Sequence, residues 1–152
     1  AASGGGGGGA APPSNISFEV RDLLATPLSA DDQAFDVIIC ADFLHDLAAP
    51  QRVVDAVYAS LKPGGVFVAV DVAADSDAKT NLDSHPMAGM LYSISFMHCM
   101  QIGLGADGKG CAHGAMWGTQ TATKLFEAAG FHDVKVSTKP GDLNATYTMT
   151  KK

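Results

Sequence analysis

The feature that most constrains this chain is a pair of apolar runs separated by a helical pattern. Phe35–Cys40 is nearly continuous in apolar, β-branched residues, and Val66–Val70 repeats that character before Asp71. Such runs are typical of parallel strands covered on both faces. Between them, Pro50 opens an amphipathic helical stripe that Pro63 and two glycines end. Strand, helix and strand in this order predict an α/β fold with a parallel sheet.

The segments on either side extend this pattern. Ile16–Arg21 alternates apolar and polar residues, which predicts a strand with one wet face. Ala73–Ser84 is polar and is expected to be a loop. Pro86–Ile102 is apolar nearly all round, which predicts a helix that is buried or lines an apolar pocket.

The last third of the chain predicts a loop, a helix and a hairpin. Gly103–Gly118 carries six glycines and is expected to be a loop. Thr119 is suited to cap a helix that Gly130 closes. A strand beginning at Val134 and another over Ala145–Thr150 then form a hairpin, so the sheet ends in an antiparallel strand.

Composition divides the chain of 152 residues into a tail and one domain. Residues 1–14 are glycine-rich and of low complexity, which predicts a flexible tail or linker before a domain over residues 15–152. Three cysteines without a disulfide-like spacing favour a reducing, cytoplasmic location. No run of eighteen apolar residues is present, so no membrane span is expected.

The net charge limits the classes of molecule that the chain is expected to bind. Ten Lys and Arg residues against sixteen Asp and Glu residues give a net charge of −6. An acidic chain without a basic stripe is a poor match for nucleic acid or for an anionic membrane. We therefore expect a small-molecule partner, with neither nucleic acid nor membrane bound.

Several strand ends carry groups suited to chemistry. Asp22, Asp42 and Asp71 each follow a predicted strand, where open α/β sheets bind ligands, although aspartate is also common at strand ends for structural reasons. His45 follows the strand Phe35–Cys40 at the same rim, where a general base would be well placed. His98 lies within the apolar helix and is a candidate for a role on the substrate side of the site. The alternative is a core histidine whose hydrogen bonds are satisfied within the protein.

Other site types find no support in the sequence. No dinucleotide fingerprint, phosphate loop or hydrolase elbow follows a strand. His98, Cys99, Cys111 and His113 lack a usual zinc spacing, so no metal site is expected.

Six short stretches resemble motifs of one enzyme family. The chain is similar to class I S-adenosylmethionine (SAM)-dependent methyltransferases, in a subgroup that carries a winged-helix domain ahead of the catalytic domain. The stretches are Val20-Arg21-Asp22, Phe35-Asp36-Val37-Ile38, Leu61-Lys62-Pro63-Gly64-Gly65, Met97-His98-Cys99-Met100, Ala115-Met116-Trp117-Gly118 and Ala129-Gly130-Phe131.

The resemblance implies a partial Rossmann-like sheet. The family has seven strands in the order 3-2-1-4-5-7-6, with strand 7 antiparallel. Ile16–Arg21 resembles strand 3, Phe35–Cys40 strand 4 and Val66–Val70 strand 5. Val134–Thr138 resembles strand 6 and Ala145–Thr150 strand 7. Strands 1 and 2 have no counterpart, so residues 15–152 correspond to the C-terminal part of the methyltransferase domain.

The resemblance also implies a site for SAM and a methyl acceptor. Asp22 and Leu23 would hold the adenine, and Ala41 and Asp42 would approach the rest of the cofactor. His45 or His98 would act as the catalytic base on the acceptor side. Three further residues would bind the acceptor: Tyr92, Met97 and Trp117.

One departure leaves alternatives open. The glycine-rich turn after strand 1 is absent, and that turn supplies backbone donors to the cofactor. We therefore expect the 152-residue chain to bind SAM poorly and to be inactive alone. It would otherwise be a non-catalytic remnant that binds partners or itself through the open edge of Phe35–Cys40, or a nucleotide-dependent oxidoreductase.

Overall fold

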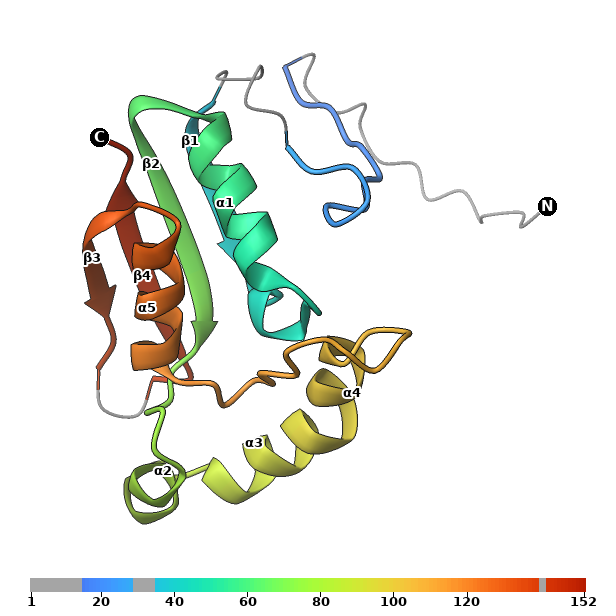
Figure 1. The fold of residues 1–152 in the computed structure, drawn as a ribbon. Coiled ribbons are helices and arrows are strands. Elements are labelled where there is room, and N and C mark those ends of the chain that lie inside the picture. Colours follow the sequence, from blue (N-terminus) through green and yellow to red (C-terminus); the bar gives the residue numbers. More distant parts are fainter. Residues whose placement is uncertain (1–14, 29–34, 140–141) are drawn as a thin grey trace, which may run out of the picture.

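The computed structural model describes residues 15–28, 35–139 and 142–152, so the predicted tail over residues 1–14 lies outside the described residues. Its sheet has four strands in the order β1-β2-β4-β3 (Figure 1). Strand β1 is parallel to β2, and β4 runs antiparallel to both β2 and β3. In the numbering of the family, β1, β2, β4 and β3 are strands 4, 5, 7 and 6. The predicted order 4-5-7-6 with an antiparallel strand 7 is thereby confirmed. The strands are β1 (Phe35–Ala41), β2 (Leu61–Val72), β3 (His132–Ser137) and β4 (Asn144–Thr150).

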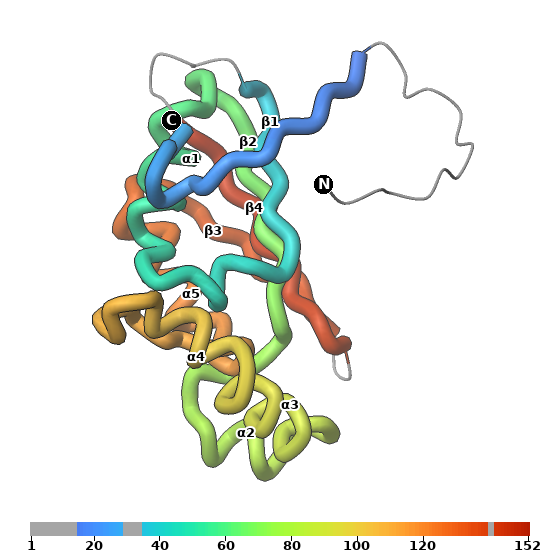
Figure 2. The backbone as a smooth tube through the Cα atoms, turned by 90° about the vertical axis from the view of Figure 1, so that its right-hand side faces the viewer, coloured from blue at the N-terminus to red at the C-terminus, as the bar shows by residue number. Residues whose placement is uncertain are grey.

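Two helices, α1 (Pro50–Ser60) and α5 (Thr119–Ala128), cover the same face of the sheet (Figures 1 and 2). Beneath them, Phe67 on β2 is fully buried and stacks on Phe131, with ring centroids 5.5 Å apart. Burying one such side chain contributes about 1.5–3 kcal/mol. The helix ends at Ser60 and β2 begins at once, so the Pro63 turn lies inside the strand rather than before it.

The opposite face of β1 is open, which corrects the prediction that this strand is covered on both sides. Side chains alternate across a strand. Cys40 therefore faces the core with 6% exposure, whereas Val37 and Ile39 are 53% and 68% exposed. The apolar run identified a strand correctly, but it did not show what packs on each face.

The predicted strand Ile16–Arg21 is wrong. This segment forms no strand, and Phe18 and Val20 are 86% and 104% exposed. A strand needs a neighbour to receive its backbone hydrogen bonds. The edge of the described sheet is β1, and no described strand flanks it on the side where strands 1 and 2 would stand.

The helical region after β2 also differs from the prediction. The expected loop Ala73–Ser84 contains helix α2 (Ala78–Ser84), which Asp77 caps by accepting from the Thr80 N–H at 2.8 Å. The expected helix Pro86–Ile102 is present in three parts: α3 (Ala88–Ile94), a π-helical turn (Ser95–Cys99) and α4 (Met100–Gly103).

The predicted burial of that region is wrong for much of its surface. Phe96 and Met97 are 64% and 70% exposed. These helices lie beyond the ends of β1 and β2, not against the sheet (Figure 1). Within the described ranges, no helix is long and apolar enough to cross a bilayer.

The predicted cap of helix α5 is wrong, because Thr119 is the first residue of the helix and not its N-cap. The N-cap position is Gly118, and Thr119 donates its N–H to the Ala74 carbonyl at 2.9 Å. The Ser76 hydroxyl accepts the Thr121 N–H at 3.0 Å. The segment after β2 thus satisfies two of the free donors at the start of α5.

Candidate functional site

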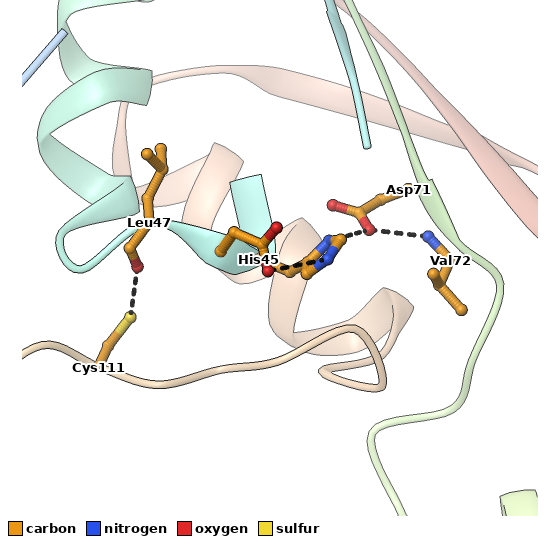
Figure 3. Close-up of polar contacts among 6 residues, drawn as sticks. His45, Leu47, Asp71, Val72 and Cys111 are labelled. Carbon is orange, nitrogen blue, oxygen red and sulfur yellow. Dashed lines mark hydrogen bonds and ion pairs between the residues drawn. The ribbon is translucent and has the colours of Figure 1, made fainter. Parts of the chain in front are cut away.

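A buried histidine–aspartate pair lies where β1 and β2 end. His45 is on a short 3-10 turn, Leu44–Asp46, that follows β1, and Asp71 is near the end of β2. Because these strands are parallel, both residues reach the same rim. His45 Nδ1 lies 2.6 Å from Asp71 Oδ1, which also accepts the Val72 N–H at 2.8 Å (Figure 3).

The pair fixes the state of the imidazole. Burial lowers the pKa of His45, but the hydrogen bond and charge of Asp71, with smaller contributions from Asp46 and Asp42, leave it above its ordinary value. A carboxylate partner at Nδ1 assigns the proton of the neutral ring to that nitrogen. Nε2 then carries the free lone pair and lies 3.3 Å from Asp46 Oδ1.

The same carboxylate affects two other buried groups. Burial, and then the charge of Asp71, raises the pKa of the Cys40 thiol to about 12. The same two causes, in the same order, raise the pKa of Tyr147. Both groups therefore stay protonated at neutral pH.

A thiol approaches His45 from the π-helical turn. Ligating atoms of His45, Asp46 and Cys99 all lie within 4.8 Å of one another. Cys99 is 5% exposed, and burial together with the Asp46 carboxylate raises the pKa of its thiol. Single π-turns inside helices are frequent at functional sites. Here the turn directs Cys99 inward while its neighbour His98 is exposed.

The glycine-rich loop holds the rim in place. The Gly114 N–H donates to the His45 carbonyl at 3.2 Å, and the φ of Gly114 is +71°. A Cβ at Gly114 would collide with Ser95 Oγ and lie 2.7 Å from Met100 Cγ. Only glycine therefore allows the loop to pass this close to the π-helical turn. Nearby, the Cys111 thiol donates to the Leu47 carbonyl at 3.4 Å (Figure 3).

The residues predicted to approach the cofactor after β1 lie at this rim. Ala41 is the last residue of β1, and the Asp42 N–H donates to the Val70 carbonyl at 2.8 Å. Asp42 has a φ of +54°, which is uncommon for a residue with a side chain. Carboxylate or ring atoms of Asp42, His45 and Asp71 lie within 4.8 Å of one another.

The residues predicted to hold the adenine lie in a separate turn. Asp22 is exposed, and its Oδ1 accepts the N–H groups of Leu24 at 2.9 Å and Ala25 at 3.2 Å. Leu23 packs against the core, and Arg52 on α1 donates to the Leu24 carbonyl at 3.1 Å. The adenine role of Asp22 and Leu23 stays a prediction.

The predicted acceptor-side residues divide by exposure. His98 and Met97 are exposed, and Tyr92 is half-buried with its hydroxyl accepting from Asn81 at 2.9 Å. Trp117 is 5% exposed and its ring lies 5.3 Å from that of His113. His98 is exposed although its neighbour Cys99 is buried, and the roles of His98, Met97, Tyr92 and Trp117 stay predictions.

A cavity of about 480 Å³ lies beyond the end of β2, between α2 and the described residues Thr138, Lys139 and Asp142. Asp75 and Asn81 in its wall are already hydrogen-bonded: Asn81 accepts the Asp75 N–H at 2.8 Å and donates to the Asp75 carbonyl at 2.7 Å. Its lining does not include His45. The chemistry therefore gathers at the rim rather than in this cavity.

The sequence placed Asp71 among the polar groups at the strand ends but gave no specific role to Asp71 or Asp46. Cys99 was considered only as a zinc ligand, in a set with His98, Cys111 and His113 that lacks a usual zinc spacing. The direct sequence neighbourhood of His45 is the signal for Asp46. No local pattern points to Cys99, because 54 positions separate it from His45 and only the folded chain brings them together.

Comparison with known proteins identifies the family. A family model described as a methyltransferase domain matches residues 11–130. The chain belongs to this methyltransferase family. The resemblance to class I SAM-dependent methyltransferases is confirmed, and a search of curated protein sequences finds no match.

Solved structures share the fold. Human N-acetylserotonin methyltransferase, in complex with SAM, is 22% identical with a TM-score of 0.62 over 93% of this chain and 35% of its own. An O-methyltransferase family protein from Burkholderia thailandensis is 17% identical with a TM-score of 0.58 over 90% of this chain and 36% of its own. The chain thus spans about a third of the length of these methyltransferases.

Proposed function

We propose that this methyltransferase chain supplies the acceptor-side half of a site for SAM-dependent methyl transfer to a small molecule, with His45 as the general base. The observation that carries the proposal is the buried His45–Asp71 pair, 2.6 Å apart, at the rim where the two parallel strands end. The family match favours methyl transfer over the oxidoreductase alternative.

The residues present fit one part of the cofactor. Ala41 and Asp42 stand at the strand end, and the Asp22 carboxylate keeps Oδ2 beyond the bonds that Oδ1 makes to its own turn. When bound, SAM supplies a methyl group on a sulfonium sulfur. Ala41, Asp42, Asp22 and Leu23 are the residues we expect to hold it. The glycine-rich turn is absent from the sequence, so we expect weak binding to the isolated chain.

His45 has the geometry of an oriented base. Asp71 accepts from Nδ1 and so holds the ring with Nε2 free to take a proton from an acceptor hydroxyl, thiol or amine. Asp71 also stabilises the imidazolium that forms. Such a base contributes about 10²–10⁴-fold when the acceptor must lose a proton. His98 is exposed, whereas His45 is buried and held by Asp71, so His45 is the preferred base.

A chimera tests this function. Residues 15–152 are joined to the N-terminal part of a class I methyltransferase, which supplies the glycine-rich turn. His45→Gln should reduce turnover with a small-molecule acceptor at least about 100-fold while SAM binding by calorimetry persists. His113→Gln is the matched control and should retain turnover. Equal turnover in the His45 variant would remove His45 as the base.

A second candidate function rests on the open edge of the sheet. Val37 and Ile39 on β1 are more than half exposed, and an unpaired apolar edge invites strand pairing. The chain would then bind partners, or a second copy of itself, through β1. Ile39→Lys should abolish a concentration-dependent dimer in analytical ultracentrifugation, whereas Val136→Lys on the opposite edge should not. A chain that stays monomeric at all concentrations would exclude self-pairing.

A further inference from the structure

The group around His45 has donors of three chemical kinds. His45 offers Nε2, Asp46 offers Oδ1 and Cys99 offers Sγ, and all three atoms lie within 4.8 Å of one another. Asp46 Oδ1 is buried and makes no hydrogen bond of standard geometry with the described residues. A buried carboxylate oxygen that lies close to a ring nitrogen and a thiol, without a well-formed hydrogen bond to either, indicates a place for a cation.

The distance between two of these ligand atoms matches tetrahedral coordination of a metal ion. Two ligand atoms that each lie about 2.0 Å from zinc, at the tetrahedral angle, are about 3.3 Å apart. His45 Nε2 and Asp46 Oδ1 are 3.3 Å apart. Nitrogen and sulfur donors favour zinc over magnesium, which prefers oxygen ligands and octahedral geometry.

The surroundings supply the support that zinc ligands usually have. Metal-bound histidines commonly donate their other ring N–H to a carboxylate, and Asp71 accepts from His45 Nδ1 at 2.6 Å. That bond also favours this group over the neighbouring set of Asp42, His45 and Asp71, because Asp71 Oδ1 is already engaged with His45 Nδ1. The Asp46 side chain is 27% exposed and provides a way in for an ion.

We propose that His45, Asp46 and Cys99 bind a zinc ion with three protein ligands and one open position. Binding releases the proton of the Cys99 thiol to solvent, and the thiolate and the Asp46 carboxylate then balance the charge of Zn²⁺. The ion occupies the lone pair of His45 Nε2. Where His45 acts as the base of the proposed methyl transfer, on which this consequence rests, zinc therefore inhibits the reaction.

Calorimetry on the 152-residue chain tests the site without cofactor or acceptor. Zn²⁺ should bind at one ion per chain with micromolar or tighter affinity, and Mg²⁺ should not bind in that range. Cys99→Ser and Asp71→Asn should each weaken Zn²⁺ binding at least about tenfold. Cys111→Ser, which changes an exposed cysteine, should bind as the original chain does. Circular dichroism shows whether each variant is folded.

Cysteine alkylation keeps the test decisive if a variant does not fold. In the original chain, Zn²⁺ should slow alkylation of Cys99, read by peptide mass spectrometry, and leave Cys111 unchanged. Absence of one-to-one binding, unaltered affinity in Cys99→Ser, or protection of Cys111 alone would overturn the site. None of these results depends on methyl transfer. If turnover in the chimera requires His45 but zinc does not bind, only this inference fails.

Discussion

The predicted site has two halves, the His45–Asp71 pair and the turn around Asp22, and different interactions hold each in place. His45 and Asp71 are each at most 3% exposed and lie at the ends of two paired strands, so the core and the sheet register position them. Asp22 lies in an exposed turn whose order comes from its own Oδ1 and from Arg52. The first half is set by the whole fold and the second by local bonds, and mutations should affect them differently.

The largest effect is expected from the core that supports the first half. Phe67→Ala removes a fully buried ring and should lower the free energy of unfolding by about 3–5 kcal/mol, read from urea denaturation. Phe18→Ala in the N-terminal segment is the control, since that side chain is 86% exposed, and should change it by less than about 0.5 kcal/mol. Similar losses from both would remove the contrast.

The second-largest effect on stability is expected from a change in the buried pair of His45 and Asp71. Asp71→Ala leaves His45 without its buried partner and should cost about 3 kcal/mol in urea denaturation. The pKa of His45, followed by NMR titration, should fall because Asp71 no longer stabilises the imidazolium. Asp83→Ala, on the exposed side of α2, should leave both unchanged. A constant His45 pKa in the Asp71 variant would contradict the assigned hydrogen bond.

The loop over the rim should show a smaller cost. Gly114→Ala forces a side chain into left-handed backbone and should destabilise the chain by roughly 1–2 kcal/mol or more, because its Cβ also meets Ser95. Thermal unfolding measures the change. Gly89→Ala, in helix α3 with open space around its Cβ, should instead stabilise slightly. A neutral Gly114 variant would mean that the loop does not pack on the π-helical turn.

The smallest effect on stability is expected in the second half. Asp22→Ala removes the acceptor of two backbone N–H hydrogen bonds. It should change the free energy of global unfolding by less than about 0.5 kcal/mol. Hydrogen exchange should nevertheless speed up at Leu24 and Ala25, and not at buried strand amides of β2. Unchanged exchange at Leu24 would show that the turn does not depend on Asp22.

Much of the fold was predictable because its signals are local. The apolar runs identified β1 and β2, the stripe after Pro50 identified α1, and the resemblance gave the strand order. Ile16–Arg21 was wrongly predicted as a strand because alternation reports that a segment suits a sheet, not that a neighbouring strand is present to pair with it. The same reason explains why the open face of β1 was not foreseen.

The sequence by itself determined the strand–helix–strand frame, its family and the place of His45 after the strand Phe35–Cys40, since these depend on side-chain period and short motifs. Only the tertiary structure decided which groups meet His45. Asp71 reaches it through the parallel register of β1 and β2, and Cys99 reaches it through a π-helical turn and a glycine-rich loop. Contacts between residues far apart in the chain depend on packing, which local patterns do not record.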